Sequence, residues 1–306
     1  MALNSCQGVA LLDPKGPIGL QERDLILMSV GLGLIILIPV FFMAIWFPLR
    51  YRESNKKATY KPHWEGNLGV EAVIWLVPVL IIAVLSYLTW VKTTDLDPYK
   101  PIPSVEAPVH VQVVSLDWNW LFIYPDSNVA VMNKLVIPAG VPVTFDLTSA
   151  TVMTSFFIPE LGSQMYAMAG MVTHLNLLAD HPGVFLGHNV EFSGAGYAGM
   201  TFQTTALPKD QFEAWAREAK ASANSLNLEE FNKLNTPQIG RAATTFASVE
   251  PNLFGHIVGE FMRPMGGGDL MKGTGDTKEK VSSDAPGAMS DGMMMKSSGT
   301  PQVISK

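Results

Sequence analysis

The chain has 306 residues, of which 48% are hydrophobic and only 16% are charged. Soluble domains average about 25% charged residues, so part of this chain is expected to lie in an apolar environment. The formal net charge is −6 and no long run of Lys and Arg occurs, which argues against a nucleic acid partner because phosphate binding needs a basic surface. Cys6 is the only cysteine, which excludes a disulfide within the chain and a metal site with two of its own thiolates.

Two uncharged segments, residues 25–49 and 72–91, are long enough to cross a membrane. A helix needs about 20 predominantly apolar residues to span the hydrocarbon core, and proline is tolerated in such helices. The sequence therefore predicts a transmembrane hairpin over residues 25–92, with spans at about 25–49 and 71–91.

The loop between the two spans, residues 50–70, is rich in basic residues. Its five basic residues are Arg50, Arg52, Lys56, Lys57 and Lys61, against two glutamates. Because positively charged loops stay on the cytoplasmic side, we expect both termini and the long segment after the hairpin on the outer side. The prediction is a two-span membrane protein with a large extracytoplasmic domain.

Cys6 lies in an N-terminal segment, residues 1–24, directly after Leu3-Asn4-Ser5. This approach resembles a bacterial lipoprotein cleavage site, in which the cysteine becomes the first residue of the mature protein and carries the lipid. The apolar stretch expected upstream is missing, so we expect that the numbered start lies inside a longer signal peptide or that this peptide has been trimmed. A free cysteine without a lipid is the alternative.

Residues 93–207 are expected to form an all-β domain. Segments rich in β-branched and aromatic residues are separated by Pro, Gly and Asn, which is typical of short strands. The expected strands lie within residues 110–125, 134–137, 141–147, 172–178 and 200–205. Their spacing favours an antiparallel sandwich or barrel.

The C-terminal part is expected to contain a helical extension, residues 208–264, and a disordered tail, residues 265–306. Apolar residues recur with helical spacing over residues 209–234, and residues 247–262 are expected to form a short helix that packs on the sandwich. The tail is rich in Gly, Ser and Met and has little to bury. Its run Met293–Met295 could bind copper(I) weakly, although a solvated tail is the preferred interpretation.

Recognisable catalytic motifs are absent from the sequence. Dinucleotide-binding glycine patterns, nucleophile elbows and zincin motifs do not occur. His174, His181 and His188 recur every seven residues, but they fall on an expected strand and on loops, where this spacing does not bring side chains together. We therefore expect no catalytic constellation within the outer domain itself.

Four features together resemble one protein family. They are the hairpin, the Trp118-Asn119-Trp120 segment, the TSFFIPEL sequence of residues 154–161 and the PGVFLGHNVEFSGAGYAGM sequence of residues 182–200. In this order they resemble subunit II of the heme–copper terminal oxidases, over about residues 6–265. The resemblance implies a two-span protein of the bacterial inner membrane with a cupredoxin-like periplasmic domain.

Cytochrome c-oxidising members of this family hold a binuclear copper centre in the cupredoxin-like domain. Its ligands are two His, two Cys four residues apart, a Glu carbonyl and a Met. At these positions the present sequence has Thr154, Asn189, Ser193 and Tyr197 in place of the His and Cys ligands, and it retains Glu191 and Met200. Copper of this kind needs thiolate or imidazole donors, so we expect no copper here. The resemblance is thus to the quinol-oxidising branch, of the cytochrome bo or ba type.

The resemblance implies that the chain is one subunit of a complex that oxidises membrane ubiquinol, reduces dioxygen to water and pumps protons. This chain would bind no cofactor, and it would brace the catalytic subunit I, which carries the hemes, the copper and the quinol site. Other oxidase subunits and membrane lipid are the remaining expected partners.

Individual residues have expected roles within this resemblance. Glu71 resembles the residue through which protons reach one uptake pathway; the alternative is a side chain that reaches the cytoplasmic headgroups. Glu191 points toward a magnesium ion in copper-bearing relatives, and it either keeps that role here or is a plain loop residue. Trp118 and Trp120 are two apart, so we expect them on one face of a strand as packing residues.

Two other functions compete with this interpretation. The first is a cytochrome c oxidase subunit II whose copper site has degenerated. The second is a membrane-tethered assembly or copper-delivery factor that uses the Met-rich tail.

Overall fold

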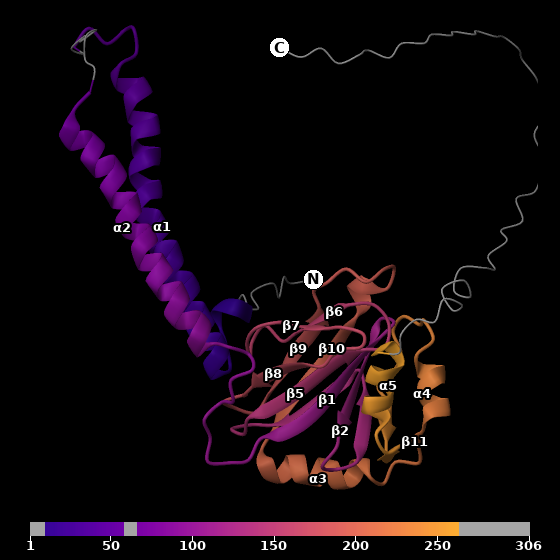
Figure 1. Ribbon diagram of the computed structural model, residues 1–306. Coiled ribbons are helices and arrows are strands. Elements are labelled where there is room, and N and C mark those ends of the chain that lie inside the picture. Colours follow the sequence, from indigo (N-terminus) through magenta and orange to yellow (C-terminus); the bar gives the residue numbers. More distant parts are fainter. Residues whose placement is uncertain (1–9, 58–65, 263–306) are drawn as a thin grey trace, which may run out of the picture. The chain divides into compact units, whose positions relative to one another are not determined.

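The computed structural model describes residues 10–57 and 66–262 (Figure 1). The helices are η1 (Ala10–Leu12), α1 (Pro17–Arg50), α2 (Leu68–Asp95), η2 (Tyr197–Gly199), α3 (Lys209–Ala219), α4 (Leu228–Leu234) and α5 (Leu253–Met262). The strands are β1 (Val109–Leu116), β2 (Asn119–Tyr124), β3 (Val129–Met132), β4 (Lys134–Pro138), β5 (Val143–Ser149), β6 (Thr154–Phe157), β7 (Met165–Ala167), β8 (Thr173–Leu177), β9 (Gly183–Asn189), β10 (Thr201–Leu207), β11 (Ser225–Leu226), β12 (Thr245–Phe246) and β13 (Ser248–Val249).

The two long helices, α1 and α2, extend beyond the uncharged segments that predicted them. Both are long and apolar enough to cross a membrane. Pro17 occupies the first turn of α1, where a missing N–H costs nothing. At the start of α2 the side chain of Asn67 accepts hydrogen bonds from the backbone N–H groups of Gly69 (2.9 Å) and Val70 (3.3 Å). The start of α2 is thus marked by a side-chain cap, and the start of α1 by Pro17.

The β-domain consists of two main sheets. Sheet A has six strands in the order β12-β3-β2-β1-β5-β8, and sheet B has five in the order β4-β10-β9-β6-β7. The expected sandwich is present, but it is not antiparallel throughout as predicted, because β1 pairs with β5 in parallel and β4 pairs with β10 in parallel. The chain crosses to sheet B at β4 before it returns to sheet A, so β5 can run in the same direction as β1.

Several elements differ from the sequence prediction. Strands β3, β6, β7 and β9 were not predicted, and the helical pattern over residues 209–234 forms two helices with β11 between them. The expected helix over residues 247–262 begins only at Leu253, because Ser248 and Val249 pair with Ser225 and Leu226. Such pairing joins distant segments, and local periodicity does not reveal it.

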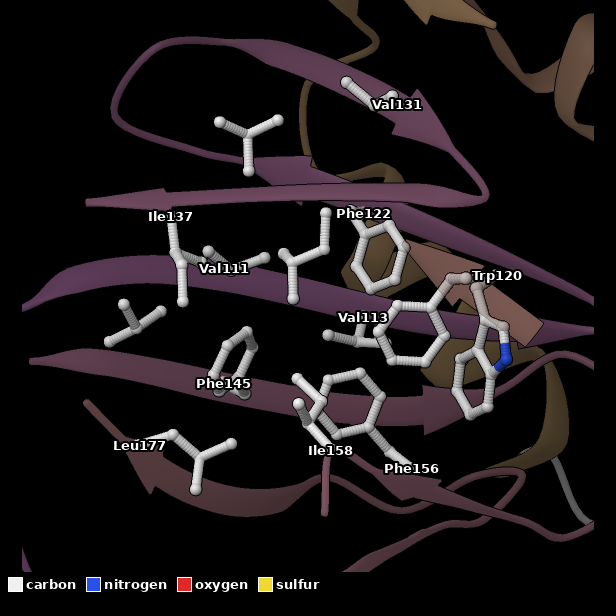
Figure 2. Packing of buried hydrophobic residues seen from close by; sticks show 14 of the residues in the cluster. Val111, Val113, Trp120, Phe122, Val131, Ile137, Phe145, Phe156, Ile158 and Leu177 are labelled. Carbon is white, nitrogen blue, oxygen red and sulfur yellow. The ribbon is translucent and has the colours of Figure 1, made fainter. Parts of the chain in front are cut away.

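The main core lies between the two sheets (Figure 2). Alternate residues of β2, namely Trp120, Phe122 and Tyr124, point into this core, as the period of two in a strand requires. The ring of Trp120 meets that of Phe156 edge to face at 5.5 Å between centroids. Phe156 in turn stacks on Phe202 of β10 at 5.1 Å. Aromatic contacts therefore join sheet A to sheet B.

A second core covers the opposite face of sheet A. Leu121 and Ile123 of β2 point into it, and the rest of its apolar surface comes largely from the C-terminal extension. Those residues of the extension are Leu226, Phe231, Leu234, Phe246, Leu253, Phe254, Ile257 and Val258. In Figure 1, α5 lies against β1 and β2, in agreement with these contacts. The part of sheet A formed by β1, β2 and β3 is consequently buried on both faces.

Backbone hydrogen bonds join the outer ends of the two long helices to the β-domain. Just before α1, the N–H of Lys15 donates to the carbonyl of Glu160 (2.6 Å), and its carbonyl accepts from the N–H of Asp180 (2.9 Å). Just after α2, the carbonyl of Pro98 accepts from the N–H of Asn176 (3.2 Å) and from its side chain (3.0 Å). Both connections to the β-domain are therefore fixed within a few residues of the helix ends.

Candidate functional site

Asn189, the last residue of β9, is the centre of the candidate site. Its side chain is 4% exposed. The amide nitrogen Nδ2 donates to the backbone carbonyl of Glu191 (2.8 Å) and to Oγ of Ser193 (3.0 Å), and it lies 3.4 Å from Sδ of Met200. Oγ of Ser193 is itself 4.0 Å from that sulfur. Four of the six positions singled out in the sequence thus meet around one amide group.

The carbonyl oxygen of the Asn189 side chain fixes the orientation of this group. Oδ1 accepts hydrogen bonds from the backbone N–H of Ser155 in β6 (2.9 Å) and from that of Glu191 (3.0 Å). Two N–H groups point at the same atom, so this atom must be the oxygen and the other must be the nitrogen. The amide therefore bridges sheet B and the loop between β9 and β10, residues 190–200, which we call the β9–β10 loop.

The other two singled-out positions have different neighbours. Thr154 is fully buried, and its hydroxyl donates to Oγ of Ser115 in β1 (2.7 Å). Tyr197 is partly exposed, and its ring packs against that of Phe192 with 5.8 Å between centroids. Among the hydrogen bonds of the described residues, neither side chain contacts Asn189. Their roles are a cross-sheet hydrogen bond and a surface aromatic contact.

Trp118 contacts the β9–β10 loop, and the sequence analysis did not predict this contact. It lies in the turn between β1 and β2 with φ of 61°, so the prediction that it shares a strand face with Trp120 is wrong. Its indole Nε1 donates to the carbonyl of Ser193 (2.9 Å). Gly196 lies against the indole: a Cβ added there would be 2.3 Å from Trp118 Cγ. Trp120, by contrast, is fully buried, and its predicted packing role is confirmed.

The chemistry of the Asn189 group differs from that of a soft-metal site. Its donors are an amide, a hydroxyl, a thioether and a backbone carbonyl, and only the thioether suits copper(I). The amide nitrogen donates hydrogen bonds and offers no lone pair. Within residues 10–57 and 66–262, no three His, Cys, Asp or Glu side chains gather in a way that could hold a metal ion. These residues do not fit a thiolate-bridged copper pair.

Two family descriptions match the β-domain and the extension. "Cytochrome C oxidase subunit II, periplasmic domain" matches residues 124–206, which include the Asn189 group. "COX Aromatic Rich Motif" matches residues 220–265, which supply most of the second core. Phe231 and Phe246 of that segment are buried in the second core.

Relatives that match most of this chain show the family to which it belongs. A cytochrome bo(3) ubiquinol oxidase subunit 2 of Pseudomonas aeruginosa is 46% identical over 261 residues, covering 85% of this chain and 78% of the relative. The chain belongs to the subunit 2 family of the ubiquinol oxidases. The ubiquinol oxidase subunit 2 of Acetobacter aceti is 44% identical over 268 residues, covering 87% of this chain and 86% of that one.

Membership in the subunit 2 family accounts for the architecture. The expected fold class is confirmed: two apolar N-terminal helices, a cupredoxin-like β-domain and C-terminal helices. These features fit a protein of the inner membrane with an extracytoplasmic domain. The crystal structure of the periplasmic domain of subunit II of cytochrome oxidase from Bradyrhizobium japonicum is 22% identical, covers 38% of this chain and 95% of that chain, and has a TM-score of 0.37.

Glu71 lies in the first turn of α2 and is exposed. Its backbone N–H donates to the carbonyl of Asn67 (3.0 Å). Its carboxylate turns back over Gly66, where an added Cβ would be 2.7 Å from Glu71 Oε1. A carboxylate in the first turn of a helix interacts favourably with the helix dipole.

The three regularly spaced histidines, His174, His181 and His188, do not share neighbours. Nδ1 of His174 in β8 is 2.6 Å from a carboxylate oxygen of Asp146 in β5. The ring of His188 in β9 meets that of Phe157 edge to face, with 5.6 Å between centroids, and burial lowers the pKa of His188. His181 lies in the loop before β9. Their seven-residue spacing therefore does not correspond to a shared site.

Some predicted features fall outside the described residues. Cys6, residues 58–65 of the loop and the Met293–Met295 run belong to these parts of the chain. The sequence analysis missed two contacts, the bridging amide of Asn189 and the hydrogen bond of the Trp118 indole. The first of them could have been inferred from the sequence. A buried asparagine at the end of an apolar strand needs partners for its whole amide.

Proposed function

We propose that the chain is subunit 2 of a membrane complex that oxidises ubiquinol at the outer face, reduces dioxygen to water and pumps protons. The support is its identity of 46% and 44% to two proteins named ubiquinol oxidase subunit 2, across most of each sequence. Its partners in this proposal are the catalytic subunit I and the other oxidase subunits.

The chain has no redox centre of its own in this proposal, and the copper site of cytochrome c oxidases has been lost. The observation that carries this idea is the Asn189 amide. Its nitrogen contacts Ser193, Met200 and the Glu191 carbonyl, so hydrogen bonds now join positions that would hold copper in copper-bearing relatives. The loop is thereby stabilised without a metal.

Electrons from quinol consequently have no acceptor in this chain and enter through subunit I. In this proposal the chain supports the catalytic subunit structurally and helps to deliver protons to it. The hydrogen bonds of Lys15 and Pro98 tie the outer domain to the two membrane helices, which suits a cap on the catalytic subunit. Glu71, at the cytoplasmic end of α2, collects protons for an uptake pathway in that subunit.

The N-terminus completes the proposed membrane attachment. Cys6 carries a lipid on the outer side, at the start of the segment that leads into α1. A lipid there adds hydrophobic anchoring of about 0.8 kcal/mol per buried CH₂ group, in addition to the two spans. Mass spectrometry of the intact chain from native membranes, before and after Cys6→Ser, tests this attachment directly.

The experiment for the main proposal is purification from native membranes through an affinity tag on this chain. A heme absorption spectrum and oxygen uptake are then recorded with ubiquinol and with reduced cytochrome c. We expect heme to co-purify and oxygen uptake to depend on ubiquinol alone.

Each alternative gives a different result in the same preparation. Oxygen uptake with reduced cytochrome c would support a degenerate cytochrome c oxidase. Isolation of the chain without heme-containing partners would support an assembly or copper-delivery factor. Either result would overturn the quinol oxidase proposal.

A further inference from the structure

A cavity of about 370 Å³ lies between the outer ends of α1 and α2 and the β6–β7 loop. We call it the junction cavity. Its volume falls in the range of about 300–1,000 Å³ that is typical of small-molecule sites. Its lining within the uncharged helix segments consists of Leu25, Ser29, Leu85, Leu88 and Thr89, and beyond them of Glu22, Lys92, Thr93, Leu96 and Ser163.

The polar end of the junction cavity carries an acidic and a basic side chain that form no direct ion pair with each other. The carboxylate of Glu22 accepts a hydrogen bond from the hydroxyl of Ser163, which holds it in place. Lys92 is partly buried, and among the described residues no carboxylate oxygen lies within 4.0 Å of its Nζ atom. A separated anion and cation in one cavity are complementary to a zwitterion.

The apolar end lies within the uncharged parts of both helices. Leu25 is the first residue of one uncharged segment, and Leu85 and Leu88 lie near the end of the other. Glu22 and Lys92 flank these segments on the outer side. The lining therefore changes from uncharged and mainly leucine to charged where the hydrocarbon core meets the headgroups, which is the polarity profile of a lipid.

We propose that the junction cavity binds one molecule of phosphatidylethanolamine from the outer leaflet. Lys92 donates hydrogen bonds to the phosphodiester, Glu22 accepts from the ethanolammonium group, and the leucines contact the first part of an acyl chain. A primary ammonium has N–H donors for a carboxylate, whereas the quaternary ammonium of phosphatidylcholine has none. Phosphatidylglycerol has no cation for Glu22, and its net charge is repelled by that carboxylate.

The test is native mass spectrometry of the tagged chain, purified with its accompanying subunits into nanodiscs of equimolar phosphatidylethanolamine, phosphatidylcholine and phosphatidylglycerol. We expect the wild type to retain phosphatidylethanolamine after activation in the gas phase. Lys92→Gln should lower the retained amount about fivefold, the effect of one cation near the membrane surface. Lys92→Arg, which keeps the charge, should retain the lipid. Glu22→Gln should abolish the preference over phosphatidylcholine.

Matched charge removals on the outer domain provide the control. Lys220→Gln and Glu218→Gln alter exposed residues distant in sequence from both helices, and both should leave retention unchanged. Equal retention in Lys92→Gln and wild type would overturn the proposal, as would equal retention of the three lipids by the wild type. A retained mass that matches a quinone and no phospholipid would do the same. Because retention is measured without turnover, the result is independent of which substrate the complex oxidises.

Discussion

The indole of Trp118 donates a hydrogen bond to the backbone carbonyl of Ser193 across 2.9 Å, joining the β1–β2 turn to the β9–β10 loop. Trp118 has φ of 61°, a value that costs a residue with a large side chain about 1–2 kcal/mol. The contact with the loop offsets this cost. A turn in sheet A and a loop that ends a strand of sheet B thus hold each other in place.

Replacing Gly196, which packs against this indole, with a residue that has a side chain should destabilise the outer domain. In Gly196→Ala the new Cβ would lie 2.3 Å from Cγ of Trp118, so the indole or the loop must move. Such overpacking costs about 1–3 kcal/mol, and we expect a lower melting temperature of the purified chain. Gly199→Ala is the matched control, because its nearest neighbour would be 3.6 Å away. Equal melting temperatures for the two variants would contradict this packing.

Asn189→Ala should destabilise the outer domain by about 1–3 kcal/mol, because it leaves the buried N–H of Ser155 without an acceptor. The same change frees the loop carbonyl and hydroxyl that the amide now joins. Thermal unfolding of the full chain in detergent measures the loss. Asn232→Ala, on the exposed side of α4, is the control and should change stability little. A loss shared by both variants would show that the amide network is not responsible.

Copper binding should be restorable with four substitutions. Nδ2 of Asn189 and Oγ of Ser193 are only 3.0 Å apart, so cysteines at these positions would face each other as a bridging pair requires. Thr154→His, Asn189→Cys, Ser193→Cys and Tyr197→His together supply two thiolates and two imidazoles, the donors that such copper demands. The fourfold variant should bind two copper ions per chain and turn purple.

The control is the threefold variant that keeps Ser193, which lacks one bridging thiolate and should stay colourless. Copper content by elemental analysis accompanies the absorption spectrum. Binding of the copper pair by the unmodified chain, or a folded fourfold variant without copper, would mean that these positions do not correspond to the ligands.

Glu71→Ala should slow ubiquinol-dependent oxygen uptake roughly tenfold, equivalent to about 1.4 kcal/mol in activation free energy. The reason is loss of the proton acceptor that we propose at the start of α2. Heme content and subunit composition should stay normal, which separates this effect from failed assembly. Glu53→Ala, an exposed carboxylate in the same loop region, is the control. Unchanged turnover in Glu71→Ala would remove this residue from the proton pathway.

His188 should make stability sensitive to acid. Burial lowers the pKa of His188 in the folded chain below its ordinary value, which is about 6.5. Between the folded and unfolded pKa values the unfolded chain binds more protons, so the free energy of unfolding falls as the pH drops through this window. Melting temperatures measured from about pH 7.5 to about pH 5 should fall less steeply in His188→Gln than in wild type.

The comparison with wild type isolates His188 from its neighbours. Asp13 and Glu160 line the same cavity as His188, and burial raises the pKa of Glu160, but both remain in the variant. His256→Gln, which alters an exposed histidine on α5, is the control. A pH profile of His188→Gln that coincides with wild type would contradict a role for this histidine.

Local sequence was sufficient to predict the elements with strong periodicity. The two long apolar helices and the strands with alternating β-branched and aromatic residues are present, since each depends on its own residues. The alternation in β2 even separates the two cores, with Trp120 and Phe122 on one side and Leu121 on the other.

Features that depend on distant partners were missed. Tryptophan is a residue type that favours strands, but the β1–β2 hairpin turns at Trp118. The contact that offsets the cost of its positive φ comes from the distant Ser193. Ser248 and Val249 form a strand only because Ser225 and Leu226 lie beside them. For the candidate site, the sequence identified the six positions, but not that one amide would connect four of them.

The pairing of β12 with β3 has a consequence for the newly made chain. β3 ends at Met132, whereas its outer partner, Thr245–Phe246, is translated much later. Until then the edge of β3 has free backbone groups, and such an edge readily pairs with other chains. A product that stops before Thr245 would also leave Leu121 and Ile123 uncovered. Premature termination there should yield an aggregating fragment that is cleared by proteolysis.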